Sequence, residues 1–258
     1  MAVAQRVRPL LGTLVSVRCH ADDVQVARNG LEAAFAAIGR VDRLMHPSRA
    51  GSELSALRRH VAGSFHVDPW TWAVLQAAAE LHVESNQLFD PCLAVCPGSL
   101  ADLRFVEPNR IETARPVAID LGGIAKGFAV DRAVDALRHN GCSAGEVNAG
   151  GDLRVFGTES SDLWIRVNGR YRSLRLRDAA CAVSDVAASE RPPEHLGYRR
   201  HDRSVTVLDI AGPAVIVAPT AMWADGLATY AVVCRSPAEH ARLRAVLALH
   251  DARRIDVG

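Results

Sequence analysis

Two segments in the first third of the chain have apolar residues at helical spacing. Between residues 24 and 45 these residues recur mostly at steps of three and four: Val24, Ala27, Leu31, Ala34, Phe35, Ile38, Val41 and Met45. Such a stripe is typical of a helix with one face on a core, and Asp22-Asp23 supplies its N-cap. A second helix is predicted from Asp68-Pro69 to about Ser85, because a capping acid precedes a proline in its first turn. Its expected core face is Trp72, Leu75, Ala79 and Leu81.

Other segments are typical of strands. The residues from Leu10 to Arg18 are rich in β-forming types, which predicts a strand there. The run from Leu163 to Leu176 predicts a hairpin, because Asn168-Gly169 suits a type I′ turn. A further hairpin is predicted from strands at 204–210 and 214–218.

The remaining elements alternate between helix and strand. A short strand at 117–120 is followed by a Gly122-Gly123 turn, a helix over 125–140 that ends at Gly141, and a strand at 145–148. Thr220 can cap a helix that runs to about Val233. A capping box from Ser236 to Glu239 opens the last helix, whose core face is Leu243, Val246 and Leu247. Helices interspersed with hairpins predict an α+β fold with mainly antiparallel sheets, and the absence of a linker predicts one domain over 1–258.

Composition narrows the class of protein. Of 258 residues, 49% are apolar, enough for a buried core, and 30 basic residues balance 29 acidic ones. That balance gives no field for a nucleic acid or an anionic membrane, and no stretch reaches the roughly 20 apolar residues of a membrane span. The first nine residues show no export signal, so we expect a cytoplasmic protein whose six cysteines are reduced. Cys92 and Cys96 lack the second pair of ligands that a zinc site needs.

The segment D-L-G-G-I-A-K-G, residues 120–127, carries the most chemical information. It places Asp120 at a strand end, two glycines in a turn and Lys126 in the first turn of a helix. Glycine lets a ligand approach the backbone, and helix N-terminal amides favour anionic oxygens. The pattern is neither a Walker loop nor a dinucleotide fingerprint. A turn chosen only for strand-to-helix packing is the alternative.

Two further clusters place oxygen atoms beside glycines. In V-N-A-G-G-D, residues 147–152, Asp152 follows two glycines and could contact a ligand or cap amides in a hairpin. In T-A-M-W-A-D-G-L-A-T, residues 220–229, Asp225 and Thr229 are four apart and share a helix face. Two hard oxygen ligands suit Mg²⁺, although such a pair also forms local hydrogen bonds.

Together these motifs resemble the ApbE family of FAD:protein FMN transferases. The order is Leu11-Gly-Thr13, Ser52-Glu-Leu54, Phe89-Asp-Pro91, then the three clusters above, and the resemblance spans roughly residues 8–235. It implies an ApbE-like, T-fold-related architecture. It also implies an enzyme that uses Mg²⁺ to transfer FMN from FAD to a threonine or serine hydroxyl of an acceptor flavoprotein, with release of AMP.

The resemblance also assigns residues. It implies metal ligation by the Gly123 carbonyl, Asp225 and Thr229. It implies flavin-nucleotide contacts at these positions: Leu11, Ser48, Phe89, Asp90, Asp120, Lys126 and Ala228. A divalent ion between pyrophosphate oxygens would neutralise charge as the acceptor hydroxyl attacks phosphorus.

Several positions depart from the family pattern. Ser48 stands where an aromatic residue packs on the flavin, so we expect weaker flavin affinity. Cys92 replaces a threonine, and A-V-S-D at 182–185 stands where A-T-S-G is usual. The H-x-x-D-P-R-T-G segment that carries the family's proposed base is not found after Ser184, and His201 is the nearest candidate for that base.

These departures leave three functions open. The first is the Mg²⁺-dependent FMN transferase. The second is a non-catalytic paralogue that binds a flavin nucleotide, and the third is an FAD pyrophosphatase in which water replaces the protein acceptor. The paralogue would keep the metal and glycine turns, and the altered segment after Ser184 is what separates it from the transferase. The sequence does not separate the pyrophosphatase from the transferase, because both need the same metal and the same leaving group.

Overall fold

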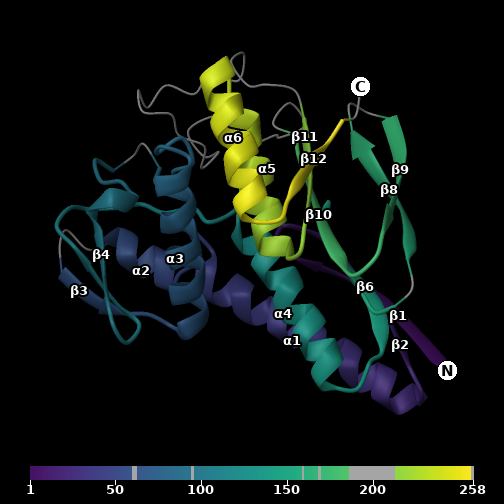
Figure 1. The fold of residues 1–258 in the computed structure, drawn as a ribbon. Coiled ribbons are helices and arrows are strands. Elements are labelled where there is room, and N and C mark those ends of the chain that lie inside the picture. Colours follow the sequence, from purple (N-terminus) through teal and green to yellow (C-terminus); the bar gives the residue numbers. More distant parts are fainter. Residues whose placement is uncertain (60–62, 94–95, 159, 168–169, 186–212, 257–258) are drawn as a thin grey trace.

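A seven-stranded antiparallel sheet forms the centre of the computed structural model, which describes residues 1–59, 63–93, 96–158, 160–167, 170–185 and 213–256. The strand order is β1-β2-β6-β7-β10-β11-β12 (Figure 1). The strands are β1 (Ala2–Leu10), β2 (Thr13–Ala21), β6 (Ala144–Ala149), β7 (Asp152–Phe156), β10 (Ala179–Ser184), β11 (Ala214–Ala218) and β12 (Arg253–Ile255).

Three helices cover one face of this sheet: α1 (Val24–Met45), α4 (Ala125–His139) and α5 (Ala221–Val233). The pleat directs alternate side chains of β2 toward them, so that Val15, Val17 and Cys19 are wholly buried whereas Leu14 is 67% exposed. Helix α4 lies between α1 and α5, and α6 (Pro237–Leu249) packs outside α5. Helix α5 is therefore buried on nearly every side from Ala224 onward.

A two-stranded ribbon, β8 (Ser161–Val167) and β9 (Arg170–Leu176), packs on the opposite face of the sheet. Its inward residues Leu163, Ile165 and Leu176 form a second apolar cluster with β7, β10 and β11. The sheet is thus buried on both faces at these strands, which explains why β11 reads as a continuous apolar run.

A smaller unit lies on the far side of α5 and α6 (left in Figure 1). It contains α2 (Glu53–Arg59), α3 (Pro69–Glu84), the 3₁₀ turn η1 (Leu100–Asp102) and a three-stranded sheet of order β3-β5-β4. These strands are β3 (Gly63–His66), β4 (Leu103–Val106) and β5 (Arg110–Thr113). None of the helices in the described ranges is long and apolar enough to cross a membrane.

The predicted helices are confirmed, with their caps. The Asp23 carboxylate accepts hydrogen bonds from two amides of α1, and Asp68 caps α3 beside its first proline. The Thr220 hydroxyl accepts from the Trp223 amide, and Ser236 forms the capping box of α6. Gly141, with φ of +84°, follows the C-cap of α4. The α+β class is also confirmed.

The strand predicted from Leu10 to Arg18 is wrong in its bounds. Leu11 and Gly12 have φ of +55° and +71°, and Leu10 pairs with Thr13, so a two-residue turn divides the segment into β1 and β2. A leucine in the left-handed region gave no turn signal in the sequence. The strand predicted at 117–120 is reduced to a single bridge between Cys92 and Ile119.

The predicted hairpin over 163–176 is present as β8 and β9, whereas its Asn168-Gly169 turn lies outside the described residues. The same is true of the strand predicted at 204–210, while its expected partner forms β11, between β10 and β12.

Helices α4 and α5 approach each other so closely that only glycine fits at the contact. A Cβ atom on Gly127 would lie 2.0 Å from the Ala221 carbonyl oxygen. Beside it, the buried Asp131 carboxylate accepts hydrogen bonds from the Ala221 and Met222 amides, both at 2.9 Å, and from Arg154 Nη1 at 2.6 Å. A side chain of α4 thus caps the first turn of α5.

This contact predicts opposite effects for two glycine substitutions. Gly127→Ala should lower the free energy of unfolding by at least about 2 kcal/mol, because backbone cannot yield to the new methyl group. Gly39→Ala is the matched control in α1, where the Cβ would meet only the flexible end of Arg43 at 3.4 Å. That change should stabilise by ~0.5–1 kcal/mol. Urea unfolding measures both, and equal effects would contradict the close contact.

Candidate functional site

Asp225 and Thr229 lie one turn apart on α5 and contact the start of α4. The Thr229 hydroxyl donates to the Gly123 carbonyl at 3.1 Å, and the Asp225 carboxylate accepts from the Gly127 amide at 3.0 Å. The two side chains therefore bond to α4 and its preceding turn rather than to each other. A Cβ on Gly123 would lie 2.8 Å from Thr229 Oγ1, so glycine is required for this approach.

A lysine and a second carboxylate complete a charged cluster, which consists of Lys126, Asp152 and Asp225. Lys126 Nζ forms an ion pair with Asp152 and lies 4.0 Å from Asp225 Oδ1. Both carboxylates are almost fully buried. Burial and the nearby charge of Asp152 raise the pKa of Asp225 to about 7, against the lowering effect of Lys126. Burial likewise raises the pKa of Asp152, although Lys126 opposes it.

The donor set at α5 fits a divalent cation. Gly123, Thr229 and Asp225 offer a carbonyl, a hydroxyl and a carboxylate, and all three are hard oxygen donors of the kind that Mg²⁺ prefers. Two carboxylates share the cluster with one lysine, so added positive charge would relieve their repulsion. Few protein ligands leave positions for water or phosphate oxygens.

A cavity of about 430 Å³ lies next to the turn that carries Gly123. Four of the residues predicted to contact flavin line it: Leu11, Ser48, Asp120 and Lys126. Its apolar walls come from Val41, Met45 and Pro47. The cavity thus has an apolar part formed by the end of α1 and a charged part formed by the 120–126 turn, and its size is in the range of small-molecule sites.

The loop after α1 is held by its own hydrogen bonds. His46 Nδ1 accepts from the Ser48 and Arg49 amides at 3.3 and 3.1 Å, and Arg49 forms an ion pair with Asp42 at 2.6 Å. Asp42 and His46 also line the cavity. Neither residue belongs to a motif that predicts ligand contact, so they could not be selected from the sequence.

The other residues predicted to contact flavin lie outside the cavity lining. Ala228 is buried in the core on α5, and Phe89 is also buried. The Asp90 carboxylate accepts from the Cys92 amide at 2.9 Å, while the Asp120 amide donates to the Pro91 carbonyl at 2.9 Å. The Phe89-Asp90 turn therefore supports the Asp120 segment. His201 lies outside the described residues.

The sequence left two roles open for Asp152, ligand contact and the capping of amides in a hairpin. Gly150 and Gly151, with φ of +69° and +110°, form the two-residue turn between β6 and β7, which confirms the hairpin interpretation. The cap in that turn is Asn148, whose side chain accepts from the Gly151 amide at 3.1 Å. Asp152 instead pairs with Lys126, a contact between two motifs that are distant in the sequence. Asp131 was also missed, although an acid on the apolar face of a predicted helix is a usable signal.

Comparison with known proteins supports one family. The sequence model described as "ApbE family" matches residues 11–103 and 97–249. An FAD:protein FMN transferase of Rhodobacter capsulatus is 29% identical over 186 residues, which cover 60% of this chain and 35% of that protein. This chain therefore matches about a third of that relative's length.

Solved structures share the fold. The ApbE protein of Thermotoga maritima has a TM-score of 0.84 at 20% identity, covering 98% of this chain and 93% of that chain. The flavin transferase ApbE of Vibrio cholerae has a TM-score of 0.78 at 20% identity, covering 98% and 92%. The predicted ApbE-like architecture is confirmed. Because the family model accounts for nearly all of the chain between residues 11 and 249, the protein belongs to the ApbE family.

Proposed function

We propose that the protein is a Mg²⁺-dependent FAD:protein FMN transferase that modifies a threonine or serine hydroxyl of an acceptor protein and releases AMP. The observation that carries this proposal is that the Thr229 hydroxyl meets the Gly123 carbonyl and Asp225 lies one turn away on the same helix, beside a cavity lined by Lys126 and Asp120. The name of the Rhodobacter capsulatus relative supports the same activity.

The two parts of the cavity suit the two parts of a flavin nucleotide. The apolar walls would hold the isoalloxazine ring, and Lys126 would bind a pyrophosphate oxygen. A divalent ion bound at Asp225 and Thr229 would neutralise the charge that develops on the phosphates. Asp225 is already oriented for this role by the Gly127 amide.

The reaction breaks the phosphoanhydride bond of FAD and forms a phosphoester bond to the acceptor. The acceptor hydroxyl oxygen forms a bond to the FMN phosphorus as the bond from that phosphorus to the AMP oxygen breaks. The hydroxyl proton passes to a base, for which His201 is the candidate by position. Lys126 would remain on the phosphates throughout and orient them for in-line attack.

Incubation with FAD, Mg²⁺ and a threonine-bearing family acceptor tests the proposal by mass measurement of the acceptor. We expect a mass gain of one FMN together with an equal amount of AMP. Release of FMN and AMP without a modified acceptor would instead identify a pyrophosphatase. Binding of FAD with no product would identify a non-catalytic flavin-binding protein.

Replacement of Ser48 should change flavin affinity. Ser48 lines the cavity, so Ser48→Tyr would add an aromatic face beside the ring and strengthen binding by ~0.5–1.5 kcal/mol, about 2- to 12-fold. Quenching of FAD fluorescence measures the change. Ser64→Tyr, at an exposed position of β3, is the control and should have no effect. Unchanged affinity in Ser48→Tyr would show that Ser48 does not face the ring.

Replacement of Asp225 should separate metal binding from folding. Asp225→Asn keeps the size of the side chain but removes the charge that holds Mg²⁺, so transfer and Mg²⁺-dependent FAD binding should both be lost while the circular dichroism spectrum is kept. His201→Ala should cost about 10²–10⁴-fold in rate if the histidine is the base. Asp135→Asn on the exposed side of α4 is the control. Tight FAD binding by wild-type protein in EDTA would contradict the metal assignment.

Lys126 should have separable effects on stability and on FAD binding. Lys126→Met leaves the buried Asp152 carboxylate without its partner and should destabilise by ~1–3 kcal/mol, less than for a fully buried pair because the Lys126 side chain is 31% exposed. Adding Asp152→Asn should restore most of this stability but not the FAD affinity. Urea unfolding and FAD titration of both variants measure the two effects. Recovery of both would show that Lys126 only neutralises Asp152.

A further inference from the structure

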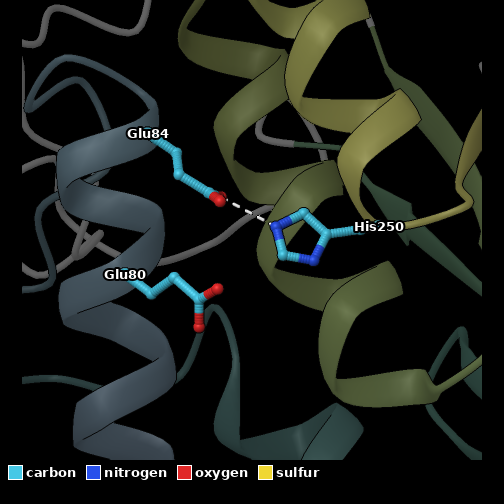
Figure 2. A group of neighbouring side chains, drawn as sticks. All are labelled: Glu80, Glu84 and His250. Carbon is cyan, nitrogen blue, oxygen red and sulfur yellow. Dashed lines mark hydrogen bonds and ion pairs between the residues drawn. The ribbon is translucent and has the colours of Figure 1, made fainter.

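A second group of potential metal ligands lies where the end of α3 meets the end of α6. Glu80 and Glu84 are one turn apart on α3, and His250 is the C-cap residue of α6. Figure 2 shows both carboxylates and the imidazole ring directed toward the same space. One ligand atom of each residue lies within 4.8 Å of the other two, and His250 Nε2 is 2.7 Å from Glu84 Oε2.

The surrounding contacts hold the His250 ring and the backbone at the end of α3 in place. The His250 ring stacks on Trp223 of α5, with 3.8 Å between ring centroids and an interplanar angle of 29°. Arg242 of α6 donates to the Glu84 carbonyl at 3.2 Å, which ties the end of α3 to α6. Glu80 is exposed, so its carboxylate can turn toward the other two and leave further positions to water.

From this geometry we propose that Glu80, Glu84 and His250 bind a divalent transition-metal ion of the zinc class. Zinc bonds of about 2.0–2.2 Å to nitrogen and oxygen place tetrahedral ligand atoms about 3.3 Å apart. Side-chain rotation alone would lengthen the 2.7 Å distance between His250 Nε2 and Glu84 Oε2 and shorten the longer distances between ligand atoms. An imidazole nitrogen selects zinc over Mg²⁺, whereas the all-oxygen set at Asp225 and Thr229 has the opposite preference.

Charge favours the same conclusion. Two carboxylates a helical turn apart repel each other. A divalent ion neutralises both and replaces the single hydrogen bond between Glu84 and His250. The bound ion would also join α3 to the chain segment that follows α6, and its histidine ligand stacks on the same helix that carries Asp225. The site would therefore stabilise the contact between the smaller unit and the helices of the sheet.

Calorimetric titration of untagged, EDTA-stripped protein with Zn²⁺ tests the proposal. Excess Mg²⁺ is kept present so that it occupies oxygen-only sites. All proteins carry Cys96→Ser, because Cys96 is the one cysteine that the structure describes as not buried and its thiol could bind zinc. We expect one Zn²⁺ per chain and a rise in Tm on binding, because an ion that binds only the folded chain stabilises it.

Substitutions locate the site. His250→Gln and Glu84→Gln should each weaken Zn²⁺ binding at least about tenfold and remove the rise in Tm, since each deletes a ligand. His240→Gln on the same helix α6 is the matched control and should bind like the parent protein. Glu80→Gln serves if the other variants fold poorly, because an exposed side chain contributes little to packing.

Each outcome decides the matter. Loss of binding in Glu80→Gln, Glu84→Gln and His250→Gln, but not in His240→Gln, supports the site. Absence of Zn²⁺ binding by the parent protein, or equal binding in His250→Gln, would overturn it and leave a simple ion pair between Glu84 and His250. Activity with FAD plays no part in the measurement, so the result is independent of the proposed transferase function.

Discussion

The close approach of α4 and α5 is the constraint on which the site depends. At Gly127 the backbones come within a distance that no Cβ permits, and the Gly127 amide is thereby presented to Asp225. Asp131 fixes the same contact from the next turn of α4 by accepting from the first two amides of α5. Burial raises the pKa of Asp131, whereas the Arg154 guanidinium lowers it. A buried carboxylate is tolerated here because three donors meet it.

This contact explains how motifs that are separated in the sequence come to lie together. The turn at 120–124 leads directly into α4, so fixing α4 against α5 also fixes the Gly123 carbonyl beside Thr229. The hairpin between β6 and β7 brings Asp152 up to Lys126 from the sheet. A glycine at 127 therefore has a packing role. Its amide lies in the first turn of α4 and has a second role as the donor that orients Asp225. The packing interpretation of the 120–127 segment thus holds at Gly127, whereas ligand binding by the segment stays a prediction.

Local signals predicted much of the fold. Helix caps at Asp23, Asp68, Thr220 and Ser236 are set by residues next to the helix they cap, and the structure has all four. The division of Leu10–Arg18 was missed because the left-handed residue is leucine rather than glycine or asparagine. The site was predictable only where a motif supplied its residues. Asp42 and His46 line the cavity because α1 ends there. That placement depends on tertiary packing, and no local sequence pattern indicates it.

The charged cluster shows why such a site can be retained at a cost to stability. With one lysine between two buried carboxylates, the ionised form of Asp225 is disfavoured by burial and by Asp152, and this raises its pKa to about 7. Replacement by apolar residues of similar size would remove that penalty, as often holds for buried ion pairs. A divalent cation and an anionic pyrophosphate would supply the missing charges together, one beside Asp225 and the other beside Lys126. In the proposed transferase, this unfavourable charge arrangement would become favourable when both are bound, which would make the two binding events mutually dependent.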